Sequence, residues 1–380
     1  MDYDLIVVGG GPVGAILARA MRGQAVALIA PARRIPKPAQ EGVFDSRVYA
    51  LSPSNAAFLQ EIGVWPAIPQ ARVAPVRAMR VFGDDRASSI EFDAYRAGVS
   101  ELAWIVEDAA LQDALWQGLG AETGDLEKIE ILEKCACVTL RGGRRFEGRL
   151  VVGADGANSL VRGAAGIAVA ESDYGQTAVV ANFGCGKPHR DTAYQWFQRG
   201  PVLALLPLPG AQVSMVWSLP SAEAQRVQRL DAGALCREVE AASRGVLGAL
   251  ALTAPVRSYP LRRVAAKRLV APRVALAGDA GHVVHPLAGQ GLNLGLQDVR
   301  QLAAVLLQRD EGRDPGDLRL LRRYERSRAE PILAMNIAIG GLFSLFGGKS
   351  DGSARLRNAG LNLVDRLPVL KNLLIRQAMS

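Results

Sequence analysis

The sequence predicts an α/β fold of two interleaved domains with a helical C-terminus, and three observations lead to this prediction. The first is a glycine-rich turn between an apolar strand and a helix, at residues 4–21. The second is a pair of later apolar strands, at 150–153 and 274–277, each followed by a turn that contains aspartate. The third is a set of alternating segments, at 79–82, 89–92 and 212–217, typical of antiparallel strands.

Composition narrows the class of protein. The chain has 380 residues, of which 49% are hydrophobic and 22% charged, as in ordinary globular proteins. Its formal net charge of +8 favours anionic partners, but no run of Lys and Arg is interleaved with aromatics, so we expect no nucleic-acid binding. Cys135 and Cys137 share one face of a strand and lack further ligands nearby, so we expect no metal site. The scattered cysteines also fit a reducing, cytoplasmic compartment.

The N-terminal motif predicts a Rossmann-like βαβ unit. Gly9, Gly11 and Gly14 form Gly-x-Gly-x-x-Gly between the strand at 4–8 and the helix at 15–21. The first glycine permits the tight turn, the second lets the backbone approach a pyrophosphate, and the third lets helix and strand pack closely. The acidic residue that usually grips the ribose is missing, because the second strand ends at Ala30. Either other groups hold the ribose or nucleotide binding is weak, and the sequence leaves both open.

Two further motifs place polar groups after strands. Asp155-Gly156 follows the strand at 150–153, and Gly278-Asp279 follows the strand at 274–277. The segment Gly289-Gln290-Gly291-Leu292-Asn293 comes next, and its glycines let backbone N–H groups face a ligand. A helix that starts near Asn293 adds the positive end of its dipole. An aspartate at a strand's C-terminal edge can accept hydrogen bonds from a polyol.

Together, the three motifs resemble those of the flavin-dependent aromatic hydroxylases. The segment 45–52, Asp-Ser-Arg-Val-Tyr-Ala-Leu-Ser, is similar to a signature of the ubiquinone-biosynthesis hydroxylases, and the resemblance covers nearly the whole chain. It implies that FAD is the cofactor. By position, the implied cofactor-binding residues are Gly9, Gly11, Pro12, Val13, Gly14, Arg47, Asp155, Gly156, Asp279, Gly289, Gly291, Leu292 and Asn293. Pro286 and the loop of Gly289, Gln290 and Gly291 are implied to lie beside the flavin, and no catalytic acid or base is assigned.

The resemblance also implies a reaction. Ring hydroxylation of a polyprenylated phenol in ubiquinone biosynthesis would use NADH or NADPH and O2 through a flavin C4a-hydroperoxide, with the nicotinamide cofactor docking transiently because the chain has one dinucleotide motif. The implied substrate pocket is Leu203, Leu205, Trp217, His285 and Pro286, although the apolar ones also fit an ordinary core. His282 and His285 are expected to hydrogen-bond within the loop. A related hydroxylase of a soluble aromatic remains one alternative. A non-catalytic scaffold in a quinone-biosynthesis complex is another, because Ala30 and Ala109 depart from the family pattern.

The domain boundaries follow from these elements. We expect an FAD-binding domain at 1–70, 98–170 and 265–330, a substrate domain at 71–97 and 171–264, and a helical C-terminal region at 331–380. In the last region, Leu363, Leu367, Leu370 and Leu374 fall on one helical face. Packing on the core and peripheral docking on the inner membrane are both open for this face. The sequence does not fix the oligomeric state.

Overall fold

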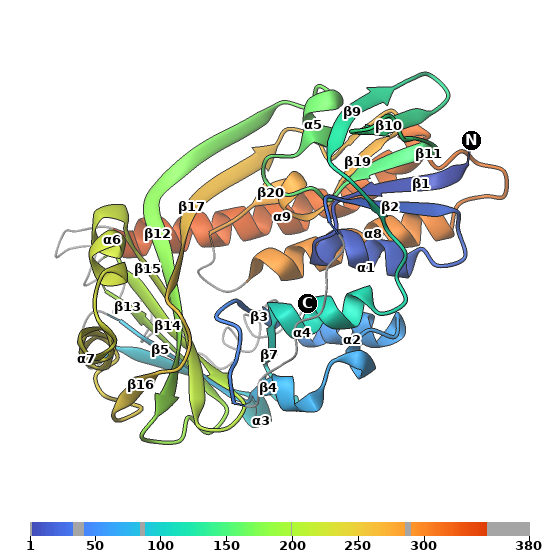
Figure 1. Ribbon diagram of the computed structural model, residues 1–380. Helices are drawn as coiled ribbons and strands as arrows, with labels where there is room; N and C mark the ends of the chain where they lie inside the picture. Colours follow the sequence, from blue (N-terminus) through green and yellow to red (C-terminus); the bar gives the residue numbers. More distant parts are fainter. Residues whose placement is uncertain (1, 33–41, 84–87, 199, 286–289, 348–380) are drawn as a thin grey trace.

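The computed structural model describes residues 2–32, 42–83, 88–198, 200–285 and 290–347 (Figure 1). One sheet contains the strands predicted around the three motifs, and its central strands are parallel, with Leu5 opposite both Val26 and Leu150. In spatial order its main path is β18 (Val270–Ala271), β19 (Val274–Leu276), β11 (Arg145–Gly153), β1 (Tyr3–Val8), β2 (Val26–Ala30) and β8 (Glu122–Thr123). β10 (Ala136–Leu140) and β9 (Leu126–Ile131) extend it from β11.

Helices surround this sheet. They are α1 (Pro12–Ala20), α2 (Pro53–Glu61), α4 (Asp108–Trp116), α5 (Leu160–Ala164), α8 (Gln290–Leu307) and α9 (Leu318–Gly347). Leu5 and Val7 of β1 pack in one core with α1, α4 and α8, whereas Ile6 and Val8 pack in a second core on the opposite face of the sheet. Burial on both faces explains why the strand Leu5-Ile6-Val7-Val8 is apolar throughout. The Rossmann-like unit is confirmed, and α8 begins at Gln290, three residues earlier than predicted.

A second, mainly antiparallel sheet contains the predicted alternating segments. Its order is β20 (His282–Val283), β17 (Arg257–Ala266), β12 (Val169–Cys185), β15 (Gln212–Pro220), β14 (Val202–Leu208), β13 (Thr192–Phe197), β5 (Ala78–Phe82) and β6 (Ser89–Asp93), with β16 (Leu250–Leu252) beside β12. Its helices are α3 (Ala94–Ala97), α6 (Ser221–Gln228) and α7 (Ala232–Ala242). Figure 1 shows the long strands β12 and β17 running from the first sheet into this one.

Smaller elements connect the two sheets. A three-stranded sheet has the order β3 (Val48–Leu51), β7 (Ala103–Glu107) and β4 (Val73–Val76). Single 3-10 turns are η1 (Trp65–Ala67), η2 (Gln70–Arg72) and η3 (Gly278–Ala280). β4 lies in a range predicted for the substrate domain, yet it pairs with β7 rather than with the large sheet. The division into two domains stays a prediction.

The C-terminal helix α9 starts before the predicted boundary. It runs through Pro331 without interruption, so the boundary between residues 330 and 331 falls inside one helix. Tyr324 and Arg328 of α9 are buried against the core, which anchors its first half. Within the described residues, no helix combines the length and the apolar character needed to span a bilayer. The predicted apolar face at 363–374 lies outside the described residues.

Candidate cofactor and active site

A cavity of about 740 Å³ lies at the carboxyl ends of β1, β2 and β11, and residues from all three predicted motifs line it. Ligands of α/β sheets bind at this edge of the strands. Of the predicted cofactor-binding residues, the lining contains Gly9, Gly11, Pro12, Val13, Arg47, Asp155, Gly156, Asp279, Gly291 and Leu292. The structure therefore brings together segments that are up to 280 residues apart in the sequence.

The glycines of the first motif differ in what surrounds them. A Cβ on Gly9 would lie 2.2 Å from the Ala154 carbonyl oxygen, and one on Gly14 would lie 1.9 Å from the Gly9 oxygen. These two glycines are needed for close packing within the protein. A Cβ on Gly11 would meet no protein atom within 4 Å, and Gly11 lines the cavity. Its missing side chain leaves room for a ligand to touch the backbone.

The first and third motifs interlock through Val13. A Cβ on Gly278 would lie 2.9 Å from Val13 Cγ2, and one on Gly295 would lie 2.8 Å from the same atom. Gly278 also has a positive φ of 61°. Glycine at both positions thus lets η3 and α8 close on α1, which brings Asp279 to the same cavity as the glycine-rich turn.

Charged and aromatic groups gather at the end of the cavity near Asp279. Burial raises the pKa of the Asp279 carboxyl, and the positive charges of His282, Arg47 and Arg262 offset part of this effect. The Arg47 guanidinium lies 5.5 Å from the centre of the Tyr49 ring, and the Tyr49 hydroxyl donates to Asp108 Oδ1 at 2.8 Å. Burial, with Asp108 nearby, raises the pKa of Tyr49. This end therefore offers an acceptor, a cation and a neutral phenol.

Asp155 divides its carboxylate between the protein and the cavity. Oδ2 accepts hydrogen bonds from the Leu160 N–H at 2.7 Å and the Val161 N–H at 3.2 Å, at the start of α5. Oδ1 is buried and has no hydrogen-bond partner among the described residues. Since an unsatisfied buried acceptor costs free energy, this oxygen is suited to a ligand donor.

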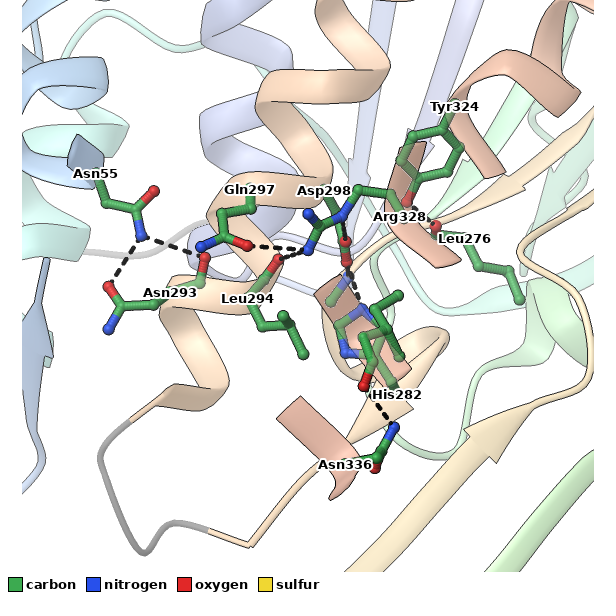
Figure 2. A network of polar contacts seen from close by, with 12 residues as sticks. Asn55, Leu276, His282, Asn293, Leu294, Gln297, Asp298, Tyr324, Arg328 and Asn336 are labelled. Carbon is green, nitrogen blue, oxygen red and sulfur yellow. Dashed lines mark hydrogen bonds and ion pairs between the residues drawn. The ribbon is translucent and has the colours of Figure 1, made fainter. Parts of the chain in front are cut away.

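A buried polar network lies behind Asp279 and fixes the turn in which it sits (Figure 2). Asp298 of α8 is fully buried, and its Oδ2 accepts from the Gly278 N–H at 2.9 Å and pairs with His282 Nε2 at 2.6 Å. Its Oδ1 accepts from Arg328 Nε of α9 at 2.7 Å. Burial by itself favours the protonated acid, but His282 and Arg328 hold the pKa of Asp298 below its usual range. Asp298 and Arg328 were not predicted, since only their paired burial distinguishes them from surface residues.

The side chain of Asn293 faces the protein rather than the cavity. Its Oδ1 accepts from Asn55 Nδ2 at 2.9 Å (Figure 2). The same oxygen accepts from the Ser52 N–H at 3.0 Å, and Nδ2 donates to the Ala50 carbonyl at 2.8 Å. Asn293 is absent from the cavity lining, as is Gly14. Asn293 thus ties the start of α8 to β3 and α2, and direct contact with the cofactor stays a prediction.

The two predicted loop histidines are both buried but have different surroundings. His282 pairs with Asp298, whereas His285 Nε2 lies 3.0 Å from Gln176 Oε1 and its ring meets the Tyr174 ring edge-on at 4.8 Å. Burial lowers the pKa of His285 to about 4, so the ring is neutral at pH 7. Both engage in hydrogen bonds near the loop. Pro286 and Gly289 lie outside the described residues.

The apolar residues predicted to line a substrate pocket lie on the other face of the large sheet. Leu203, Leu205 and Trp217 pack in a core with Val227 of α6 and Val239 of α7. Their placement supports the core interpretation and corrects the pocket interpretation. Successive strand residues point to opposite faces, so the opposite face carries Val180, Val202, Ala204, Leu206 and Val216.

The opposite face of the large sheet is the one that meets the cavity walls. Val202 and Phe197 pack with Val284, which lines the cavity, and with Leu294 of α8. Asn182 Nδ2 donates to the Phe44 and Asp45 carbonyls at 2.9 and 3.0 Å, just before Arg47. These residues alternate along the strands with the residues that were predicted, so the two sets point to opposite faces of the sheet. The sequence alone did not reveal which face the helices cover.

The residues present fit FAD. The cavity volume falls within the range of about 300–1,000 Å³ seen for small-molecule sites. The open backbone at Gly11 and the start of α8 suit a pyrophosphate and a flavin carbonyl, and Asp279 suits ribityl hydroxyls. Gln112 of α4 also lines the cavity but was not predicted, because a helical glutamine carries no motif signal.

Known families and proteins match this chain. Residues 2–335 match the model of the FAD binding domain family. The chain is 33% identical to the 3-demethoxyubiquinol 3-hydroxylase of Escherichia coli strain K12, covering 99% of this chain and 98% of that protein. It is also 33% identical to the ubiquinone hydroxylase UbiL of Rhodospirillum rubrum, covering 99% and 89%.

Solved structures share the fold. An FAD complex of a Klebsiella pneumoniae HpxO variant superposes with a TM-score of 0.78 at 19% identity, covering 99% of both chains. PqsL of Pseudomonas aeruginosa, a probable FAD-dependent monooxygenase, superposes with a TM-score of 0.76 at 23% identity, covering 95% of this chain and 99% of that one. The chain therefore belongs to the FAD binding domain family and, within it, to the flavin-dependent monooxygenases that include the ubiquinone hydroxylases.

Proposed function

We propose that this protein is an FAD-dependent monooxygenase that hydroxylates the aromatic ring of a polyprenylated phenol in ubiquinone biosynthesis, with NADH or NADPH and O2 as co-substrates. The observation that carries the proposal is the full-length similarity to two named ubiquinone-pathway hydroxylases. It is supported by a cavity that all three predicted motifs line.

The residues of this chain would bind, orient and shield the cofactor. The Gly11 backbone and the start of α8 hold the pyrophosphate and the flavin edge, and Asp279 accepts from the ribityl hydroxyls. When bound, FAD would supply the redox chemistry, in which NAD(P)H is the reductant and the two atoms of O2 end in the hydroxylated ring and in water. Buried His285 is neutral at pH 7, and the proposed hydroxylation uses no protonated side chain at the ring.

We assign the substrate side to the sheet face that meets the cavity walls. Val180, Ala204 and Val216 form a cross-strand row there, in register from β12 through β15 to β14. Small and β-branched apolar side chains on this row suit a flat aromatic ring and exclude water from the reaction. Gln176, on the same face, holds His285 at the edge of the row.

The proposal is tested by reconstituting the protein with FAD and measuring NAD(P)H oxidation. A prenylated phenol should accelerate oxidation and yield a product heavier by one oxygen atom. NADH and NADPH are compared in the same assay. Equal or faster turnover with small water-soluble phenols would favour the soluble-aromatic alternative. FAD binding without turnover on either class of phenol would favour the scaffold.

We further propose peripheral membrane contact through the exposed face of α9. Leu333 and Ile337 are 60% and 64% exposed and lie one turn apart, and Arg322 and Arg326 precede them on the same face. Exposed apolar side chains next to basic ones favour an anionic bilayer surface. Co-sedimentation with anionic vesicles should fall when Leu333 and Ile337 are both changed to serine, and unchanged co-sedimentation would contradict this contact.

A further inference from the structure

The adenosine end of the cavity lacks the acidic residue that usually binds the ribose. Ala30, the last residue of β2, lines the cavity, and its Cβ would lie only 2.7 Å from a Cβ on Gly10. Trp116 of α4 closes the same corner, 2.9 Å from that Cβ position. Among the described residues, small and aromatic groups fill the space next to the end of β2, so a polar contact at this corner has to come from another described element.

Gln112 of α4 is the polar side chain that lines the cavity near this corner. It precedes Trp116 by four residues, so both lie on one face of the helix. Gln112 is only 8% exposed, and its Oε1 has no hydrogen-bond partner among the described residues. A buried amide without a partner costs roughly 1–3 kcal/mol, which a ligand hydroxyl would recover. The amide offers both donors and an acceptor, as does a ribose hydroxyl.

Helix α4 is fixed so that Gln112 keeps this position. The buried guanidinium of Arg19, in α1, donates to the Leu115 carbonyl at 2.8 Å and to the Ala114 carbonyl at 3.2 Å. It also donates to the Gln117 carbonyl. A cation at the carboxyl end of a helix is favourable. Since α1 also begins at the glycine-rich turn, the Gln112 amide and the pyrophosphate site are held by one rigid unit.

We propose that Gln112 binds the adenosine ribose hydroxyls of FAD, in place of the acidic residue that is absent at Ala30. Gln112 is thereby a specificity-determining residue for the nucleotide half of the cofactor. The proposal rests on FAD as the cofactor and not on the identity of the aromatic substrate.

The test measures Kd values of the purified apoprotein by flavin fluorescence and by displacement of FAD. The probes are FAD, FMN, ADP and 2′,3′-dideoxy-ADP. Gln112→Leu should weaken FAD binding about tenfold and leave FMN binding unchanged, because the amide lies at the nucleotide end. The wild type should prefer ADP to dideoxy-ADP, and Gln112→Leu should lose that preference. Gln112→Glu keeps an acceptor and should retain it.

A matched variant and a stability measurement serve as controls, and two results would contradict different parts of the proposal. Gln60→Leu, on the exposed side of α2, should match the wild type in every Kd. Equal FAD affinity in Gln112→Leu and wild type, or an equal loss for FMN, would overturn the role of Gln112 while leaving the cofactor assignment intact. A wild type that binds ADP but no FAD would instead overturn the cofactor on which the proposal rests. Thermal unfolding of the apoproteins checks that Gln112→Leu is folded.

Discussion

The two ends of the cofactor cavity are built in different ways. At the end near Asp279, Asp298 of α8 binds three other parts of the chain: the backbone of η3, the His282 ring and the Arg328 guanidinium. At the end near Ala30, small apolar groups meet a lone amide, Gln112. The first end is fixed by internal pairing before any ligand arrives. Within the described residues, the second keeps an amide oxygen without a hydrogen-bond partner, which a ligand can pair.

This difference separates groups that mainly stabilise the fold from groups that mainly contribute to ligand affinity. A group that is satisfied within the protein contributes mainly to stability, and its loss is felt without cofactor. A group left without a partner costs stability in the apoprotein and contributes to affinity when the ligand binds. Substitutions at the two ends should therefore divide differently between unfolding free energy and FAD affinity.

The largest expected effect is at Asp298. Asp298→Ala leaves His282 and Arg328 buried without their shared partner, so the free energy of unfolding of the apoprotein should fall by about 3–5 kcal/mol. Urea denaturation followed by circular dichroism measures it. Lys128→Ala breaks the exposed pair with Glu130 at 2.7 Å and should cost only a small part of this loss. Equal losses in the two variants would break the comparison.

The glycine-rich turn offers a matched pair of alanine substitutions. Gly9→Ala forces a Cβ to 2.2 Å from Ala154 O at a φ of 121°, so it should destabilise the apoprotein. Gly11→Ala meets no protein atom and should leave stability unchanged, while weakening FAD binding by about 10- to 100-fold through overpacking against the cofactor. Thermal unfolding and FAD titration of both variants are the measurements. Unchanged FAD affinity in Gly11→Ala would place the cofactor elsewhere.

Asp279→Asn should have opposite effects on the stability of the apoprotein and on its affinity for FAD. The raised pKa of Asp279 means that folding penalises the ionised acid, so its contribution to stability is present at acid pH and is lost as pH rises through the folded pKa. The apo variant should thus be slightly more stable than wild type at pH 7 and equal to it below the ordinary Asp range. FAD binding should weaken about tenfold, because the charged acceptor is lost. A less stable variant at pH 7 would contradict this sign.

Much of the fold could be predicted, while the site could be predicted only in part. Glycines and apolar strands report local backbone needs, so the Rossmann-like unit and the turns at Asp155 and Asp279 were found at their true places. Asp298 and Arg328 depend on packing between distant helices, which no local pattern encodes. For Leu203, Leu205 and Trp217, the sequence left a substrate pocket and a core both open, because both faces of their strands are apolar, and the structure places them in the core.

The smallest expected effect is at His285 and appears only in acid. Burial lowers its pKa to about 4 from an ordinary value of about 6.5, so neutral His285 supports the fold above pH 6.5, and this support is lost as pH falls toward 4. His285→Gln cannot be protonated, so it should lose less stability than wild type between pH 7 and pH 5, by about 1–2 kcal/mol, with little difference at pH 7. If the unfolding free energies of wild type and His285→Gln change in parallel with pH, water reaches His285. The exclusion of water that we propose for the neighbouring sheet face would then be wrong.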